Sequence, residues 1–248
     1  KISIQNTNLA LFLNSAEASY KKLANFGDSL QASISNFILS PNPENLKKAK
    51  EVLLQTHHQY MLSQVFQKID ILHPEFDLLQ SQDPVIHPLH IRLDQFPLIK
   101  GYLDAVPNYP FSGLVFSEHK LSIDYLNNEH QFSDKAYVAI GFHALELMLT
   151  GAINQTLEER SLEFTKITNT SDTSTPSYRR SVYIQLLTEL INNDLKKLLI
   201  AWTGNNGFYA KALNELAPDE SERLIQQAYK IEEHALSKIK EHVNDAHS

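Results

Sequence analysis

Apolar residues recur at helical spacing along much of the chain. Between Leu9 and Ile38 they repeat every three or four positions over about thirty residues, which is the pattern of one long amphipathic helix. A second helix should begin at Pro43, because Asn42 suits the N-cap and Glu44 suits the positive end of the helix dipole. We expect these two helices to pack as an antiparallel pair.

The helical pattern is interrupted between residues 71 and 116 by prolines. They are Pro74, Pro84, Pro88, Pro97, Pro107 and Pro110. Proline lacks the backbone N–H and clashes with the preceding turn, so no long helix can cross this segment. Structureless connections of this length are uncommon in compact domains. We therefore predict short helical turns and loops that wrap across the helices and have a functional purpose.

Helical spacing returns after this segment. Ser133 is the expected N-cap of a helix that contains GFHALELMLTG and ends at Gly151. The Ser- and Thr-rich tract 165–177 predicts an exposed loop, and long helices are expected over 177–202 and 217–243. No segment shows the period of two that marks a strand, so the predicted class is all-α, built from up-and-down helix pairs.

The composition limits the function classes. With 248 residues the chain can bury a substantial core, as one large domain or two small ones, without a structural metal or a disulfide. A net charge of -7 argues against general nucleic-acid binding, and the absence of cysteine excludes disulfides, thiolate metal sites and Cys nucleophiles. No apolar stretch is long enough to cross a bilayer. Small ligands or cations are the more suitable partners.

The apolar run GFHALELMLTG carries two ionisable residues, His143 and Glu146. Three positions apart on a helix, they lie on one face and converge, and a neutral imidazole with a carboxylate suits iron, zinc or a similar divalent ion. Gly141 would let another backbone come close. Two ligands are too few for a complete site, so a buried His-Glu hydrogen bond without a metal is the alternative. A zinc-protease HExxH motif is excluded, because Ala144 follows His143.

Other histidines are weaker candidates for the same site. His57 and His58 are adjacent and point in different directions on a helix, which makes a joint site unlikely. His87 and His90 flank a proline in the irregular segment, and they would add a ligand if that segment folds over the site.

Two arginines need a negative partner. Arg179 and Arg180 fall in the first turn of the helix expected from Pro176, where the dipole disfavours cations. Their partner is either an acidic residue in a structural salt bridge, or a carboxylate or other anion bound in a cleft.

Several of these segments resemble the imelysin-like family. These are bacterial envelope proteins linked to iron uptake and catalogued as a metallopeptidase family, peptidase M75. GFHALELMLTG resembles their GxHxxE signature, and RLDQFPLIKGYLD resembles their Asp-x-Trp-Pro segment with Phe96 in the Trp position. FSGLVF resembles the Gly-Leu stretch that follows, and RRSVYIQLLTELINNDLKKLLIAW resembles the Arg-Arg-x-x-Tyr helix. The matching segments span Arg92 to Trp202 in the family's order.

The resemblance implies an all-helical imelysin-like domain over residues 1–248, commonly two packed four-helix bundles with the signature facing a cleft. It implies that His143 and Glu146 form the centre of the site, with Asp94 as a third ligand or a supporting group. The family's second N-terminal helix often carries a Glu before an aromatic, and the best match here is Gln64. A neutral amide binds cations more weakly than a carboxylate, so Gln64→Glu should strengthen metal binding.

The expected function is therefore an envelope protein that captures iron, or iron with a ligand, and passes it to iron-transport components. The location would be the periplasm or an outer-membrane anchor, with a signal peptide or lipid anchor upstream of Lys1. The alternatives are a metallopeptidase with Glu146 as base, and a helical interaction module with a purely structural His-Glu pair. If His143 binds the metal, affinity should fall as the pH drops through about 6 to 7, where histidine titrates.

Overall fold

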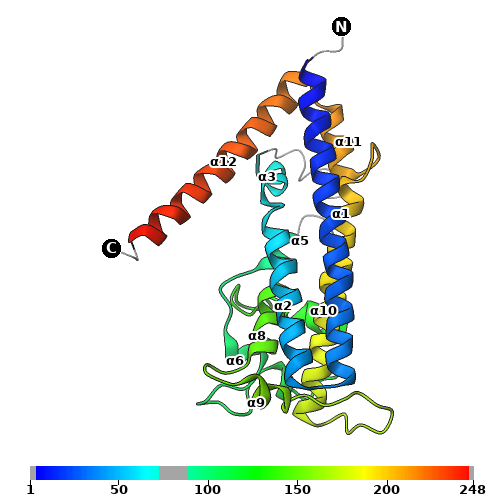
Figure 1. Cartoon of the computed structure of the whole chain (residues 1–248), viewed down its shortest axis with the longest axis vertical. Coiled ribbons are helices and arrows are strands. Elements are labelled where there is room, and N and C mark those ends of the chain that lie inside the picture. Colours follow the sequence, from blue (N-terminus) through cyan, green and yellow to red (C-terminus); the bar gives the residue numbers. More distant parts are fainter. Residues whose placement is uncertain (1–3, 73–88, 246–248) are drawn as a thin grey trace. The chain divides into compact units, whose positions relative to one another are not determined.

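The structure is a computed structural model that describes residues 4–72 and 89–245 (Figure 1). In these residues every regular element is a helix, so the all-α class is confirmed. The chain divides into two compact units. Unit 1 comprises residues 1–23, 58–88 and 196–248, and unit 2 comprises residues 24–57 and 89–195. This division does not test the expected pair of four-helix bundles, which stays a prediction.

The described helices range in length from 3 to 36 residues. In chain order they are α1 (Ile4–Leu39), α2 (Pro43–Met61), α3 (Gln64–Leu72), α5 (Leu89–Asp94), α6 (Lys100–Leu103), the 3-10 turn η1 (Leu114–Phe116), α7 (Ile123–Glu129), α8 (Phe142–Thr150), α9 (Leu157–Ser161), α10 (Pro176–Trp202), α11 (Phe208–Glu215) and α12 (Pro218–Asp245). None of the helices in the described part of the chain is both long enough and apolar enough to span a membrane.

The first two long helices begin and pair as the sequence predicts. The Asn42 side chain accepts a hydrogen bond of 2.9 Å from the backbone N–H of Asn45, and α2 starts at Pro43. Within unit 2, α1 and α2 run antiparallel, and the Thr56 hydroxyl donates to the Phe26 carbonyl at 3.4 Å. The local capping signal and the apolar spacing were therefore sufficient to place this pair.

Aromatic side chains form the core of unit 1. The Trp202 ring stacks between Tyr20, with ring centroids 5.9 Å apart, and Tyr209, with centroids 4.7 Å apart. Phe12 and Phe66 meet edge to face beside them at 5.2 Å. Each of these pairs buries a large apolar area, so the cluster ties α1, α3, α10 and α11 together.

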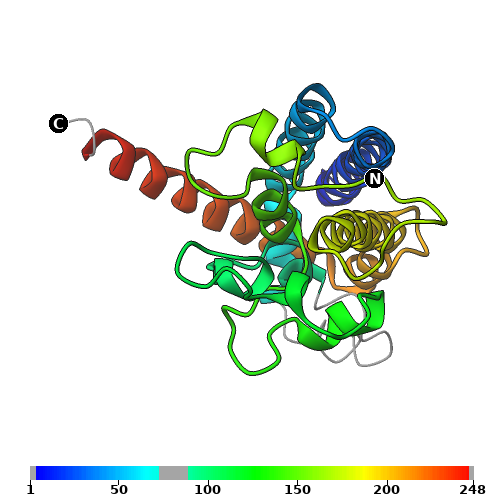
Figure 2. The ribbon, with the colours of Figure 1, turned by 90° about the horizontal axis from the view of Figure 1, so that it is seen from below.

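In unit 2, α8 lies beside the lengths of α2 and α10 that belong to this unit (Figure 2). Its side chains Leu145, Met148 and Leu149 are fully buried. The short helices α5 and α6 pack against it, and the Tyr183 hydroxyl of α10 donates to the carbonyl of Ala139 just before it at 2.7 Å. Packing from several elements therefore fixes the position of α8.

The start of α8 differs from the prediction. The helix begins at Phe142, with Gly141 as N-cap, and residues 133–141 form no regular helix. Gly141 has a φ of 94°, which is incompatible with an α-helix and favours glycine. A Cβ at this position would lie 2.4 Å from the carbonyl oxygen of Arg92. Another backbone does come close to Gly141, as expected, and His143 consequently lies in the first turn of α8. The predicted end at Gly151 is confirmed.

The other predicted elements are largely confirmed. The proline-rich segment contains only α5, α6 and η1 between residues 89 and 116, while residues 73–88 lie outside the described part. The Ser- and Thr-rich tract is a loop up to α10. The second predicted helix is divided by a turn at residues 62–63 into α2 and α3, and three further helices were not expected: α7, α9 and α11 have 7, 5 and 8 residues. Helical periodicity is read over windows of about 11 residues or more, so elements this short leave no clear signal.

Candidate metal site

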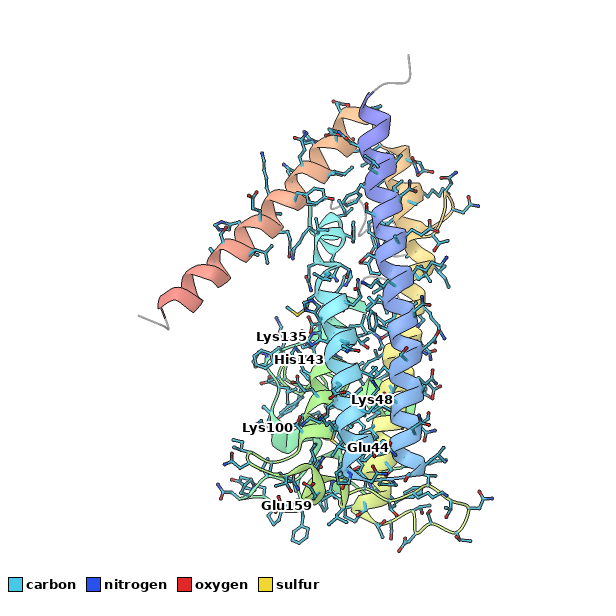
Figure 3. The ribbon with its side chains drawn as sticks, viewed as in Figure 1. Glu44, Lys48, Lys100, Lys135, His143 and Glu159 are labelled. Carbon is cyan, nitrogen blue, oxygen red and sulfur yellow. The ribbon has the colours of Figure 1, made fainter. Side chains whose placement is uncertain are left out.

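Three side chains of unit 2 converge on one point. His57 comes from α2, Asp94 from the end of α5 and His143 from the first turn of α8 (Figure 3 labels His143). One carboxylate oxygen, Asp94 Oδ1, lies 2.6 Å from Nε2 of His57 and 3.1 Å from Nε2 of His143. The three donor atoms all lie within 4.8 Å of one another. Segments far apart in the sequence thus build a group of two imidazoles and one carboxylate.

Ring packing orients the two imidazoles. The His57 ring stacks on Phe142, with centroids 4.8 Å apart and planes inclined by 16°, and meets His143 edge-on at 5.1 Å. On the outer side, the Phe96 ring lies 5.1 Å from the His143 ring and is 67% exposed. The histidines therefore have little freedom to turn, yet solvent reaches the site beside Phe96.

The carboxylate is positioned through its helix, α5. The Arg92 guanidinium donates to Asp194 of α10 at 2.9 Å and to Asn127 of α7 at 2.8 Å. The carbonyl of Arg92 also abuts Gly141 at the start of α8. Contacts on two sides thus hold Asp94 against His143.

Glu146 lies on the other side of the His143 ring. Its Oε2 is 3.7 Å from Nδ1 of His143, and its side chain is 60% exposed. The Glu146 carboxylate is therefore in solvent, and the shortest polar contact of His143 is with Asp94. A carboxylate on the second nitrogen orients an imidazole and makes it a better donor. Glu146 suits that supporting role, and its predicted role as a metal ligand stays a prediction.

The close contacts shift the pKa values of the group. Burial alone would raise the pKa of Asp94, but the hydrogen bonds with His143 and His57 outweigh it and lower the pKa to about 2. The hydrogen bond with Asp94, assisted by Glu146, raises the pKa of His143 to about 9. The contact with His143 lowers the pKa of Glu146, and the ammonium of Lys50 adds to that effect. Near neutral pH, His143 is therefore protonated and donates from Nε2 to Asp94 Oδ1. The same carboxylate oxygen also contacts Nε2 of His57.

These shifts change the expected pH dependence of metal binding. An ion that binds Nε2 of His143 must displace its proton, and with a pKa of about 9 that competition extends well above neutrality. We expect affinity for zinc to rise about tenfold per pH unit between pH 6 and 8, with about one proton released per ion. The sequence-based window of about 6 to 7 used the ordinary histidine pKa, and the raised pKa of His143 moves the expected window upward.

Calorimetric titrations in buffers of different ionisation enthalpy measure both quantities, since the observed heat varies with the number of protons released. An affinity that is constant between pH 7 and 8 would contradict a protonated His143 in the metal-free protein.

The two arginines are occupied by the protein itself. Arg180 makes a bidentate pair with Asp104, at 2.8 and 3.0 Å, so it has the structural salt bridge that was one of the two alternatives. Arg179 donates instead to the carbonyl oxygens of Leu114, Val115 and His119 at 2.6 to 2.9 Å. Arg179 thus holds the loop around η1. The alternative of an anion bound by both arginines has no support from these contacts.

The remaining candidates do not join the group in the described structure. Gln64 is the first residue of α3 and belongs to unit 1, so its part in the site stays a prediction. His90, in α5, is not a member of the three-residue group, and His87 lies outside the described residues.

The sequence did not predict His57 as a member of the site, because His57 was considered only together with the adjacent His58. One signal was present. His57 lies four positions after the buried Leu53 and three before the buried Tyr60, so it borders the apolar face that α2 turns toward its neighbours.

Comparison with known proteins supports the resemblance found in the sequence. A family model for imelysin, peptidase family M75, matches residues 16–247, which include all the residues of the candidate site. A search of curated proteins gave no match.

Proposed function

Because the chain belongs to the imelysin family, peptidase family M75, we propose that it is a metal-binding protein that takes part in bacterial iron uptake. The observation that carries the proposal is the convergence of His57, Asp94 and His143 within 4.8 Å. Two imidazole nitrogens and one carboxylate oxygen form a donor set that suits ferrous iron and zinc. In this proposal the ion is cargo that is bound and released.

The distances between the donor atoms agree with a metal ion taking the place of the proton between Asp94 and His143. Ligand bonds of about 2.0 to 2.2 Å place neighbouring donor atoms roughly 3 Å apart around an ion. The 3.1 Å separation of Asp94 from His143 already meets this, while the 2.6 Å hydrogen bond to His57 would lengthen. Three ligands leave coordination positions for water or for a ligand that travels with the ion. Such an open site suits reversible binding.

Titration calorimetry with zinc and, under anaerobic conditions, ferrous iron tests the proposal. We expect one ion per chain and a rise in the thermal unfolding temperature, because an ion that binds only the folded state stabilises it by mass action. Magnesium, which prefers oxygen donors and retains its water, serves as the control and should bind much more weakly. Absence of both heat and stabilisation with every transition metal would refute the proposal.

Peptidase activity is the second candidate function, and the family's peptidase classification favours it. An ion at this site would lower the pKa of a bound water, and the exposed Glu146 carboxylate, 3.7 Å from His143, would act as base. Incubation of the zinc-loaded protein with a mixture of peptides tests this directly. Cleavage that disappears in Glu146→Gln even when the variant is saturated with zinc would establish the peptidase in place of the transport role.

For location we propose the periplasm or an anchored position at the outer membrane, as expected for an iron-uptake protein of the envelope. Iron-transport proteins of the envelope would then be its partners. Fractionation of cells that express the full-length gene tests this location. Recovery of the protein only from the cytosol would contradict it.

A further inference from the structure

A hollow of about 440 Å³ adjoins the candidate metal site in unit 2. It lies between one face of α2 and one face of α8, and α9 contributes to its wall through Leu157. His57 and Glu146 line both this hollow and the metal site. A molecule in the hollow would therefore reach the ion directly.

The wall of the hollow has an apolar part and a part that carries charged groups. Leu54 and the half-buried Leu157 supply apolar surface, and Leu54 is 68% exposed although it is a large hydrophobic side chain. Lys47 and Lys50 line it on one face of α2, together with the carboxylates of Glu51 and Glu146. No salt bridge to either ammonium group occurs within residues 4–72 and 89–245.

The size, polarity and charge of the hollow limit the class of molecule that can bind in it. Small-molecule sites typically measure about 300 to 1,000 Å³ and combine apolar walls with a few polar groups that orient the ligand. An aromatic or otherwise apolar body would cover the exposed surface of Leu54 and Leu157. A negative group would pair with Lys50 and be drawn to the ion beside His57. A bare hydrated ion would use none of the apolar wall.

We propose that this hollow binds the organic anion that accompanies the metal, an aromatic chelator with adjacent oxygen donors of the salicylate or catecholate type. The proposal rests on the proposed function, since the chelator and His57, Asp94 and His143 share one ion. Its oxygens fill the coordination positions that the protein leaves open, and its ring lies on the apolar wall. The cargo is thus a metal chelate: the three protein ligands bind its metal, and the apolar wall of the hollow contacts its ring.

Salicylate is a suitable probe, with zinc as a redox-inert ion. Calorimetry should show that salicylate binds the zinc-loaded protein at least about tenfold more tightly than the metal-free protein. Zinc must then bind the salicylate-saturated protein more tightly by the same factor, because linkage between two sites is reciprocal. Citrate, which has oxygen donors but no ring, should show much weaker coupling.

Two matched pairs of variants locate the effect. Lys50→Gln should lower the coupling factor several-fold, whereas Lys48→Gln, which removes the same charge from a position outside the hollow on α2 (Figure 3), should leave it unchanged. Leu54→Gln should weaken salicylate binding, whereas Leu39→Gln, at an exposed leucine (59%) at the end of α1, should not. None of these side chains belongs to the metal group, so zinc binding alone remains measurable in each variant.

The outcomes separate this inference from the function on which it rests. Zinc binding with no coupling to salicylate, or with equal coupling to citrate, overturns the chelate proposal and leaves the metal-binding function standing. Lack of binding of zinc, ferrous iron and every other transition metal tested overturns both. Equal losses in Lys50→Gln and Lys48→Gln would place the anion elsewhere and also overturn the proposal.

Discussion

Replacing His143 with alanine is expected to lower the affinity for zinc or ferrous iron by about 100-fold or more. The substitution removes one of three donors and also removes the ring that Asp94 and Glu146 hold in place at 3.1 and 3.7 Å. Loss of groups that merely support a metal ligand already lowers affinity by about 10- to 100-fold, so loss of a ligand should have at least this effect. His57→Ala should lower the affinity similarly.

His58→Ala is the matched control. His58 is adjacent to His57 in α2, is exposed, and is not a member of the metal group. Calorimetry should therefore give wild-type affinity for this variant, and circular dichroism should show the same helical content for all three. If His143→Ala binds zinc as tightly as the wild type does, the group is structural and the function lies elsewhere in the protein.

Gly141→Ala should destabilise the protein and also abolish metal binding. A φ of 94° is strained for alanine, and the new Cβ would lie 2.4 Å from the Arg92 carbonyl oxygen and 2.7 Å from that of Leu93. Both are backbone atoms of α5, so the clash can be relieved only by moving the helix that carries Asp94. The strain of a φ/ψ combination that essentially only glycine adopts, about 1 to 3 kcal/mol, together with this displacement leads us to expect roughly 2 to 4 kcal/mol of lost stability.

Gly204→Ala separates strain from steric clash. Gly204 also has a positive φ, 58°, but a Cβ there would meet nothing within 4 Å. This control should lose only about 1 kcal/mol and should keep its zinc affinity, as measured by urea denaturation and calorimetry. Equal losses of stability in the two variants would show that α5 does not depend on the close approach at Gly141.

Local signals in the sequence were sufficient for elements that depend on local chemistry. The Asn42-Pro43 cap starts α2, and Gly151 ends α8, because each residue acts within its own turn. The start of α8 was misplaced at Ser133, since it depends on a contact between Gly141 and the backbone of α5. No capping preference within the segment itself contains that information.

The same distinction holds for the site. His143 and Glu146 stood out because polar residues are unexpected in an apolar run, and Asp94 was suggested only by the family resemblance. His57 acquires its role from the packing of α2 beside α8, which a single sequence does not specify. The helix dipole argued that Arg180 needs an anion, and the structure identifies it as Asp104 at 2.8 Å. The pattern of charged residues in the sequence does not reveal the partners of Arg179, because they are backbone carbonyls.

The aromatic core of unit 1 contains an intrinsic fluorescence probe, Trp202. Trp202 is the single tryptophan of the chain, is 2% exposed, and stacks between two tyrosine rings in unit 1. Its emission therefore reports the opening of unit 1, while far-ultraviolet circular dichroism averages over the helices of both units. Coincident denaturation curves from the two signals would show that both units unfold as one cooperative body. A fluorescence transition that precedes the loss of helix would show that unit 1 opens while the metal-binding unit stays folded.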